Sequence, residues 1–213
     1  MPLFGLNDRE GSGHHALVTA IPMHVAMPTI GGEEADSDLV ARLRTGERAA
    51  VEQAYVAHHA AIRGFARRLV GDDASAEDIV HETFVALPRA IRRFRSEGSL
   101  RSFLIGIAIN HSRRHVRAAI RRRRATDRLA ARDALRPQMP DATEQLITKQ
   151  LAEKLWAALD ELPHEQRIVF VLCEAEQRSS VEVARIVGAP EGTVRTRLFH
   201  AKRKLREALE DGS

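Results

Sequence analysis

The sequence is poor in cysteine. Its 213 residues include one, Cys173, so a disulfide framework and a zinc site built from several cysteines are both excluded. This usage fits a reducing cytosol. Because Cys173 follows the apolar residues 168–172, we expect it to be a buried, small hydrophobic residue.

Long hydrophobic runs are also missing. No stretch reaches the roughly 18 apolar residues needed to cross a membrane. Residues 16–27 are mildly apolar, but Pro22 and His24 interrupt them and no basic residue immediately precedes them, which makes a poor signal peptide. We therefore expect a cytoplasmic protein that is not embedded in a membrane.

Catalytic and metal-binding motifs are scarce. The sequence has no phosphate-cradling glycine loop and no nucleophile motif. His111 and His115 lie one helical turn apart and could bind a metal, but no carboxylate stands between them in an H-E-x-x-H pattern. We expect no catalytic residue, no metal, no cofactor and no small-molecule substrate. An enzyme stays as an alternative that stoichiometric zinc would favour.

The residues that are present favour helices. Aromatic residues make up 4% of the chain, while Ala, Leu, Arg and Glu dominate, and these residues lose little entropy in a helix. We expect an all-α protein in which two helical domains, residues 36–120 and 144–210, follow a disordered tail, residues 1–35. Residues 121–143 are expected to be a basic, arginine-rich linker that is partly helical at most.

Basic residues are unevenly distributed. The formal net charge is +4, yet one short segment holds a cluster of arginines: Arg113, Arg114, Arg117, Arg121, Arg122, Arg123, Arg124 and Arg128. A phosphate backbone is a natural partner for such a cluster, because the guanidinium group can donate two parallel hydrogen bonds to it. On charge alone, a solvated basic linker explains the segment equally well.

The C-terminal part has the pattern of a helix-turn-helix. Val181, Ala184 and Val187 are expected to face inward on its first helix, which Gly188 can end in a left-handed conformation. The second helix, residues 191–209, would direct Phe199 outward beside arginines, where it could contact a thymine methyl in a major groove. An ordinary helical hairpin with a basic outer face is the alternative.

Several motifs then point to one family. Residues 191–198, Glu-Gly-Thr-Val-Arg-Thr-Arg-Leu, closely resemble the recognition helix in region 4 of extracytoplasmic-function sigma factors of bacterial RNA polymerase. Leu162-Pro163 with Arg167 resembles the start of that region. Residues 38–55 and 73–84 are similar to regions 2.1 and 2.2, and residues 94–110 to regions 2.3 and 2.4. The resemblance covers residues 36–209, with both domains in the expected order.

The resemblance implies a mechanism and a set of site residues. The protein would bind core RNA polymerase, through the clamp helices of the largest subunit and the beta flap, and direct it to promoter DNA. An anti-sigma factor is a further expected partner. The minus-35 element would be read by Thr193, Arg195, Thr196, Arg197, Phe199, His200 and Arg203. The minus-10 element would contact Phe94, Arg95, Ser99, Asn110, Arg113, Arg114 and Arg117. Asp78, His81 and Glu82, which share one helix face, would bind the polymerase.

The sequence also departs from the family pattern. Phe103 stands where the family usually has Trp, and Pro88 lies within a helix that is normally uninterrupted. Cys173 replaces a common Arg, and Gln177-Arg178-Ser179 replaces the usual Gly-apolar-Ser before the helix-turn-helix. A repressor or activator that binds its DNA site without polymerase is the remaining alternative, and it differs from a sigma factor in binding duplex DNA tightly on its own.

Overall fold

The computed structural model describes residues 33–94, 98–126 and 154–210, and every regular element within these ranges is helical. The first half contains α2 (Glu33–Thr45), α3 (Arg48–Val70), α4 (Asp73–Ala90), the short 3-10 helix η1 (Ile91–Arg93) and α5 (Leu100–Thr126). The second half contains a helix at residues 154–160, α7 (His164–Phe170), the π-helical turn η3 (Val171–Ala175), α8 (Ser180–Val187) and α9 (Glu191–Glu210). We refer to these halves as the N-terminal and C-terminal domains. The prediction of an all-α fold is confirmed.

The helices of the N-terminal domain end where local signals predict. Gly71 adopts the left-handed conformation (φ 86°) and its N–H donates to the carbonyl oxygen of Arg67 at 3.0 Å, which closes α3. Asp72 then caps α4 by accepting from the N–H of Ser75 at 2.7 Å. A side chain at position 71 would also collide with Asp160 of the C-terminal domain, so glycine is required here for two reasons.

Two boundaries differ from the expectation. The first helix begins at Glu33 rather than near Asp36, because Glu33, Glu34 and Ala35 are compatible with a helix and acidic residues favour its N-terminus. At its far end the domain continues as α5 through Thr126, so the start of the predicted linker is helical. The rest of that linker, and residues 1–32 of the predicted tail, lie outside the described residues.

Pro88 does not interrupt α4, but the regular helix ends two residues after it. The helix extends past Pro88 to Ala90 and then tightens into the 3-10 helix η1. Proline has no backbone N–H to donate to the carbonyl four residues earlier, and its ring crowds that carbonyl, so regular helix does not continue far beyond it. This change of helix type places Phe94 at the start of the loop that leads to α5.

The helix-turn-helix has the predicted form. Ser179 and Glu182 make a reciprocal capping box at the start of α8, and Gly188 ends that helix in the left-handed conformation (φ 68°). One inward residue was predicted wrongly. Val181 is 45% exposed and Val183 is fully buried, because α8 begins only at Ser180 and its apolar face is rotated toward the N-terminal domain.

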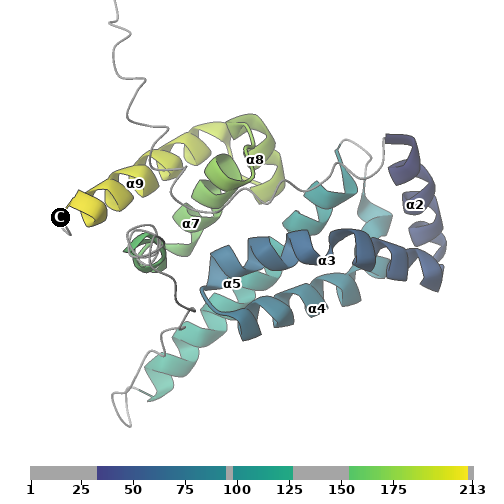
Figure 1. Cartoon of the computed structure of the whole chain (residues 1–213), viewed down its shortest axis with the longest axis horizontal. Coiled ribbons are helices and arrows are strands. Elements are labelled where there is room, and N and C mark those ends of the chain that lie inside the picture. Colours follow the sequence, from purple (N-terminus) through teal and green to yellow (C-terminus); the bar gives the residue numbers. More distant parts are fainter. Residues whose placement is uncertain (1–32, 95–97, 127–153, 211–213) are drawn as a thin grey trace, which may run out of the picture.

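The two domains pack against each other through a shared hydrophobic core. Figure 1 shows α3 and α4 side by side, with α7, α8 and α9 to one side of them. Buried residues of the N-terminal domain form one continuous cluster with Ile168, Val169, Leu172 and Val183 of the C-terminal domain. A smaller cluster lies under α9 and includes Leu159, Ala201 and Leu205. The sequence pattern did not predict this close docking.

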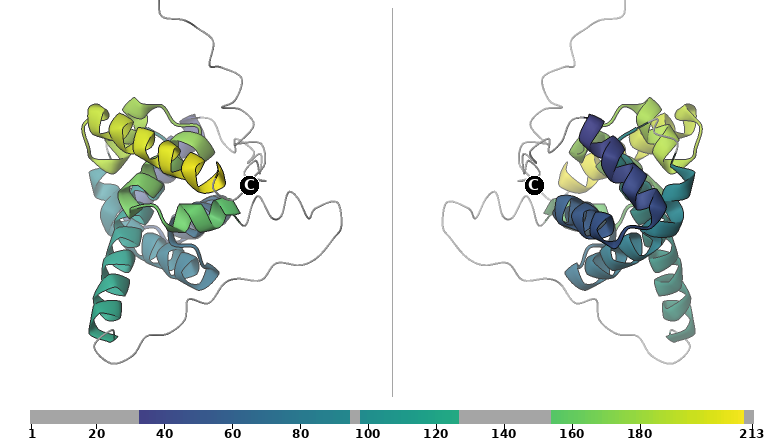
Figure 2. Two further views of the ribbon diagram at one scale, coloured as in Figure 1. Left: turned by 90° about the vertical axis from the view of Figure 1, so that its left-hand side faces the viewer. Right: turned by 90° about the vertical axis from the view of Figure 1, so that its right-hand side faces the viewer.

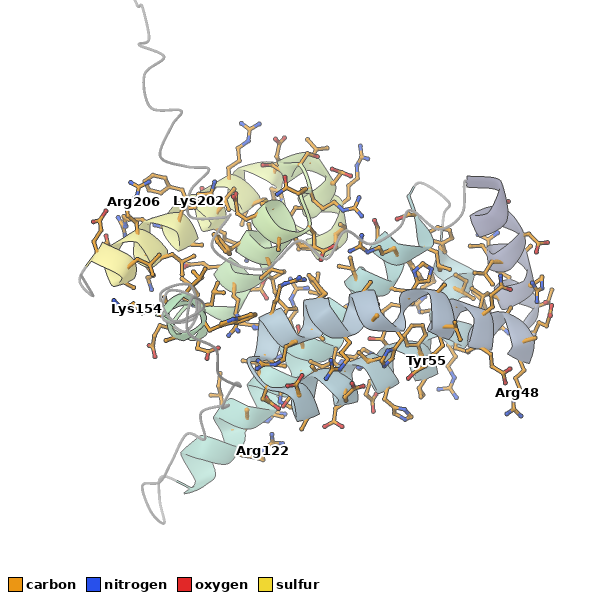
Figure 3. All side chains as sticks on the ribbon, viewed as in Figure 1. Arg48, Tyr55, Arg122, Lys154, Lys202 and Arg206 are labelled. Atoms are coloured by element: carbon orange, nitrogen blue, oxygen red, sulfur yellow. The ribbon has the colours of Figure 1, made fainter. Side chains whose placement is uncertain are left out.

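The last turns of α5 extend away from the docked domains. Both views of Figure 2 show this end of the helix projecting beyond the other described helices. Arg122, which is exposed, lies on it (Figure 3). Arg121 and Arg122 of the arginine cluster are thereby exposed to solvent on a helix. None of the described helices has a stretch apolar and long enough to span a membrane.

Candidate nucleic-acid interface

The outer face of α9 carries the residues that were predicted to read double-stranded DNA. Phe199 is 63% exposed, as expected, and its ring lies against that of His200 with centroids 5.6 Å apart. Thr196 is exposed, and its hydroxyl donates to the carbonyl oxygen of Gly192 at 2.9 Å. An exposed phenyl ring beside threonine and arginine side chains offers an apolar contact to a thymine methyl as well as hydrogen bonds to base edges. This face therefore has the chemistry of a binding surface.

Arginines on α9 are held by glutamates in the free protein. Arg195 lies 2.6 Å from Glu191, one turn earlier on the helix, and Arg203 lies 3.6 Å from Glu207. Because both pairs are solvent-exposed, they contribute little stability and are easily exchanged for phosphate or a base edge. Thr193, at the helix start, is half-buried.

Arg197 differs from these neighbours. Its Nη1 contacts the carboxylate of Glu165 on α7 at 3.2 Å, and its side chain is 29% exposed. The guanidinium group therefore lies toward the interior of the C-terminal domain. One of its donor groups is therefore occupied by Glu165 in this structure.

A second candidate surface is a cavity beside the start of α5. Its volume is about 650 Å³, within the range of pockets that hold small molecules. The rings of Phe94 and Phe103 lie 5.1 Å apart at its wall, and the exposed Asn110 also lines it. Aromatic rings can stack on a base, and an amide offers both a donor and an acceptor to the edge of a base.

The cavity has two supports that the sequence did not indicate. Nη2 of Arg44 on α2 donates to the carbonyl oxygen of Phe94 at 2.5 Å and so fixes the start of the loop. Ser99 accepts from the N–H of Ser102 at 3.2 Å, so its hydroxyl caps α5 at the mouth of the cavity. Arg95, another predicted contact, lies outside the described residues.

The three arginines of α5 that were predicted to contact DNA are in different environments. Arg114 and Arg117 are exposed, and Nε of Arg117 donates to the carbonyl oxygen of Arg113 at 3.1 Å. Arg113 instead makes two hydrogen bonds to Glu165, at 2.8 and 2.9 Å. Of these arginines, Arg113 alone takes part in the contact between the domains.

The outer face of α4 carries the predicted polymerase-binding residues. Asp78, His81 and Glu82 are all exposed. Glu82 lies 3.6 Å from Nδ1 of His111, and burial lowers the pKa of His111, which disfavours the charged form of that histidine beside the patch. The sequence prediction missed Val85, which is 61% exposed on the same helix, and Tyr55, which is 41% exposed on the neighbouring α3.

Tyr55 was expected in the apolar stripe of its helix, but it is 41% exposed. It lies on the side of α3 near α4 (Figure 3), with its ring centroid 5.0 Å from that of Phe84. Helical spacing alone does not distinguish a core position from one at the edge of the core, since both lie on the same stripe. The result is a surface that combines acidic groups with exposed apolar side chains.

The histidines that were considered as metal ligands, and the single cysteine, have different surroundings. Within the described ranges no group of three or more His, Cys, Asp or Glu residues is arranged to hold a metal ion. Cys173 is half-buried rather than fully buried, and burial raises the pKa of its thiol to about 11. A thiol with so high a pKa is protonated at pH 7 and is a poor nucleophile.

Two protein-family models match the chain. Residues 54–124 match the family model for Sigma-70 region 2, and residues 152–205 match that for Sigma-70 region 4. The two matches together cover more than half of the chain. The chain belongs to the sigma-70 family, as an extracytoplasmic-function sigma factor.

Curated relatives are similar over nearly their whole length. The RNA polymerase sigma-H factor of Pseudomonas aeruginosa is 28% identical over 185 residues, which is 84% of this chain and 95% of the relative. The ECF RNA polymerase sigma-E factor of Escherichia coli (strain K12) is 26% identical over 183 residues, or 83% of this chain and 93% of the relative. This sigma factor therefore binds core RNA polymerase and directs promoter-specific initiation of transcription.

Solved structures of sigma factors share the fold. CnrH in complex with the cytosolic domain of CnrY aligns with a TM-score of 0.59 and 25% identity, covering 84% of this chain and 99% of that one. The sigma factor RpoE of Bartonella quintana, in complex with the anti-sigma factor NepR, aligns with a TM-score of 0.59 and 24% identity, covering 75% and 96%.

Proposed function

We propose that this sigma factor divides promoter recognition between the cavity at Asn110, which binds a minus-10 base, and the outer face of α9, which reads the minus-35 element. The observation that carries the first assignment is the cavity itself. It combines an aromatic pair, Phe94 and Phe103, with an exposed amide. A base flipped out of the duplex presents a ring face and a hydrogen-bonding edge, and this cavity complements both.

The second assignment rests on the exposure of α9. The proposed minus-35 contacts are Thr193, Arg195, Thr196, Arg197, Phe199, His200 and Arg203. Arg195 is 70% exposed and its carboxylate partner is on the same helix, so it can turn to the N7 and O6 atoms of a guanine at little cost. Arg114 and Arg117, together with the projecting end of α5, would follow the phosphate backbone.

The outer face of α4 is proposed to bind the clamp helices of the largest polymerase subunit. Asp78, His81 and Glu82 supply polar and acidic groups, and Val85 on α4 and Tyr55 on the neighbouring α3 supply apolar area. An apolar centre with a charged rim is typical of a protein–protein interface. The C-terminal domain would contact the beta flap.

An anti-sigma factor is proposed as a regulatory partner. The similar sigma factor RpoE was solved with the anti-sigma factor NepR bound, and the similar protein CnrH with the cytosolic domain of CnrY bound. A location in the cytoplasm and the absence of enzymatic activity follow from the role in transcription. A DNA-binding repressor that acts without polymerase is the competing proposal.

The deciding experiment is transcription in vitro with core RNA polymerase from the same host and fragments of its genome. We expect start sites at a defined set of promoters, and no tight binding of the isolated protein to the same duplexes. If the protein bound those duplexes tightly and the polymerase gave no transcript, the repressor would be favoured and the assignments above would be withdrawn.

A further inference from the structure

One face of α5 forms a wall of the cavity that contains Asn110. The lining positions on this helix recur at intervals of three and four residues, which places them on the same side. They are Ser102, Phe103, Gly106, Ile107 and Asn110. Gly106 lies in the middle of this set and is the one member without a side chain. The wall therefore has a gap at that position.

Neither the backbone conformation nor the packing requires a glycine at position 106. The residue lies within α5 and is not among the glycines with a positive φ. Apart from its own helix backbone and the two adjacent residues, a Cβ atom there would have one neighbour within 4 Å. That neighbour is the carbonyl oxygen of Ile186 at 3.9 Å, an ordinary van der Waals contact. Because glycine is less favourable than alanine within a helix, the residue lowers the stability of α5 without a structural benefit at that position.

The gap lies between two groups that are proposed to bind the base. Phe103 precedes Gly106 by three residues and Asn110 follows it by four, so the ring and the amide are two helical turns, or about 10 Å, apart along the helix axis. A base that contacts both groups must lie across position 106. Residues three and four apart are neighbours on a helix surface, so a side chain at position 106 would stand between the ring and the amide.

We infer that Gly106 determines the size of the minus-10 base that the cavity accepts, and that its missing side chain gives room for a purine. A purine has two fused rings and reaches across the gap between Phe103 and Asn110 better than the single ring of a pyrimidine. This inference rests on the proposed assignment of the cavity to a minus-10 base. Phe94, Phe103 and Asn110 all belong to the N-terminal domain, so the size limit does not depend on where α8 lies.

The test fills the gap with Gly106→Leu in the full chain. Leucine is a good helix former, so we expect this variant to melt at the temperature of the wild type or above it. Gly106→Ala adds one methyl group and should raise the melting temperature by about 2–4 °C. Gly106→Met fills the same space with a flexible, unbranched side chain and replaces the leucine variant if the branched side chain does not fit.

The size of the accepted base is measured with holoenzyme and fork-junction DNA, in which the strand that carries the flipped base is single-stranded at the minus-10 element. Each base is placed in turn at the position where Asn110→Ala loses its preference, and Kd is measured by fluorescence anisotropy. For the wild type we expect at least one purine to bind within about threefold of the better pyrimidine. Gly106→Leu should raise Kd about tenfold for both purines, as expected when the stacking of one base is removed, and no more than about twofold for the pyrimidines.

Gly64 on α3 provides the matched control. It is half-buried within a helix, as Gly106 is, and a Cβ atom there would meet nothing within 4 Å. It does not line the cavity. Gly64→Ala should raise the melting temperature as Gly106→Ala does. Any effect of Gly64→Leu on Kd should be the same for every base.

The outcomes separate this inference from the proposed function. If Gly106→Leu and Gly106→Met change Kd by the same factor for every base, Gly106 does not limit the size of the base and the inference is wrong. A wild type that already rejects both purines would also overturn it, because the gap then gives no room for a second ring. In both cases the proposed function stands if Asn110→Ala alters the preference at one minus-10 base. If Asn110→Ala alters it at no position, the proposed function of the cavity is wrong, and the role of Gly106 fails with it.

Discussion

The carboxylate of Glu176 lies 2.5 Å from Nη2 of Arg101, although 75 residues separate them in the sequence. Arg68 approaches the same carboxylate from α3, at 3.4 Å, and burial lowers the pKa of its guanidinium group. The side chain of Glu176 is only 4% exposed. One glutamate thus balances two arginines across the boundary between the domains.

Removal of this charge should weaken the docking of the domains. In Glu176→Gln the two arginines lose their counter-charge, and we expect a cost of about 1–3 kcal/mol, since a partly buried charge is left without compensation. Urea unfolding followed by Trp156 fluorescence should show a lower midpoint. Glu207→Gln, which removes an exposed glutamate on α9, is the control and should change the midpoint little. Equal midpoints for both variants would contradict the role of Glu176.

Acid should destabilise the docked protein through His164. Its Nε2 lies 3.0 Å from the hydroxyl oxygen of Ser112, and burial lowers its pKa from 6.5 to about 4. Because the folded state disfavours the proton, the stability is fully present above pH 6.5 and is lost as the pH falls toward 4. The loss amounts to about 3 kcal/mol at most.

The measurement that isolates His164 is the unfolding midpoint as a function of pH. His164→Gln keeps a hydrogen-bonding side chain but cannot take up a proton in this range. We expect its midpoint to vary less than that of the wild type between pH 6.5 and 4.5. Parallel pH profiles for the two proteins would assign the acid sensitivity to other groups.

Local structure could be predicted from the sequence because the interactions that decide it are local. The capping box joins Ser179 to Glu182, three residues later, and Gly188 ends the same short helix in the left-handed conformation. The contact between Arg113 and Glu165 spans 52 residues, and no pattern in the sequence relates the two. The docking of the domains, and the hydrogen bonds of Arg113 and Arg197 to Glu165, therefore became evident only in the folded chain.

The predicted burial was also wrong for two residues at the edge of the hydrophobic core. Helical spacing placed Val181 and Tyr55 inside, yet both are partly exposed. An apolar stripe predicts which side of a helix is covered, but how much of it is covered depends on the neighbouring element. Exposure was easier to predict for Phe199 and Asn110, because each lies opposite a well-defined inner face of its helix.

Gln177 departs from the family pattern, and we expect this departure to lower the stability of the folded chain. This residue, which stands where a glycine is usual, adopts φ 54°, in the left-handed region. Its side chain donates to the carbonyl oxygen of Glu174 at 2.8 Å. Gln177→Gly and Gln177→Ala both lose that bond. Glycine avoids the backbone strain but gives the unfolded chain more conformational entropy, and because the strain is the larger effect we expect the glycine variant to be more stable by up to about 1 kcal/mol.

Thermal unfolding of both variants provides the measurement, and Arg206 provides the control. Arg206 is exposed within α9, where glycine is less favourable than alanine. The order of stability should therefore reverse at that position, with Arg206→Ala above Arg206→Gly. The same order at both positions would mean that the strain at Gln177 is negligible.

Substitution of Asn110 should affect promoter opening rather than polymerase binding. Asn110→Ala removes the amide from the cavity, so preference at one minus-10 base should be lost and open complexes should form more slowly. Asn110→Asp keeps the size but removes the NH₂ donor, and should change the preferred base instead. Transcription from a set of promoters with each base at each minus-10 position distinguishes these effects. An unchanged profile for both variants would exclude Asn110 from base recognition.

Arg195 should provide specificity at one minus-35 base pair. Its guanidinium group is 70% exposed and contacts only Glu191 on its own helix, so it is free to turn into a major groove. Arg195→Ala should cost about 1–3 kcal/mol at the base pair that it contacts, if the contact to guanine is bidentate. Holoenzyme binding to promoters with substitutions at each minus-35 position measures this, and Arg206→Ala on the same helix is the control. A loss that is uniform across all sequences would assign Arg195 to the phosphate backbone instead.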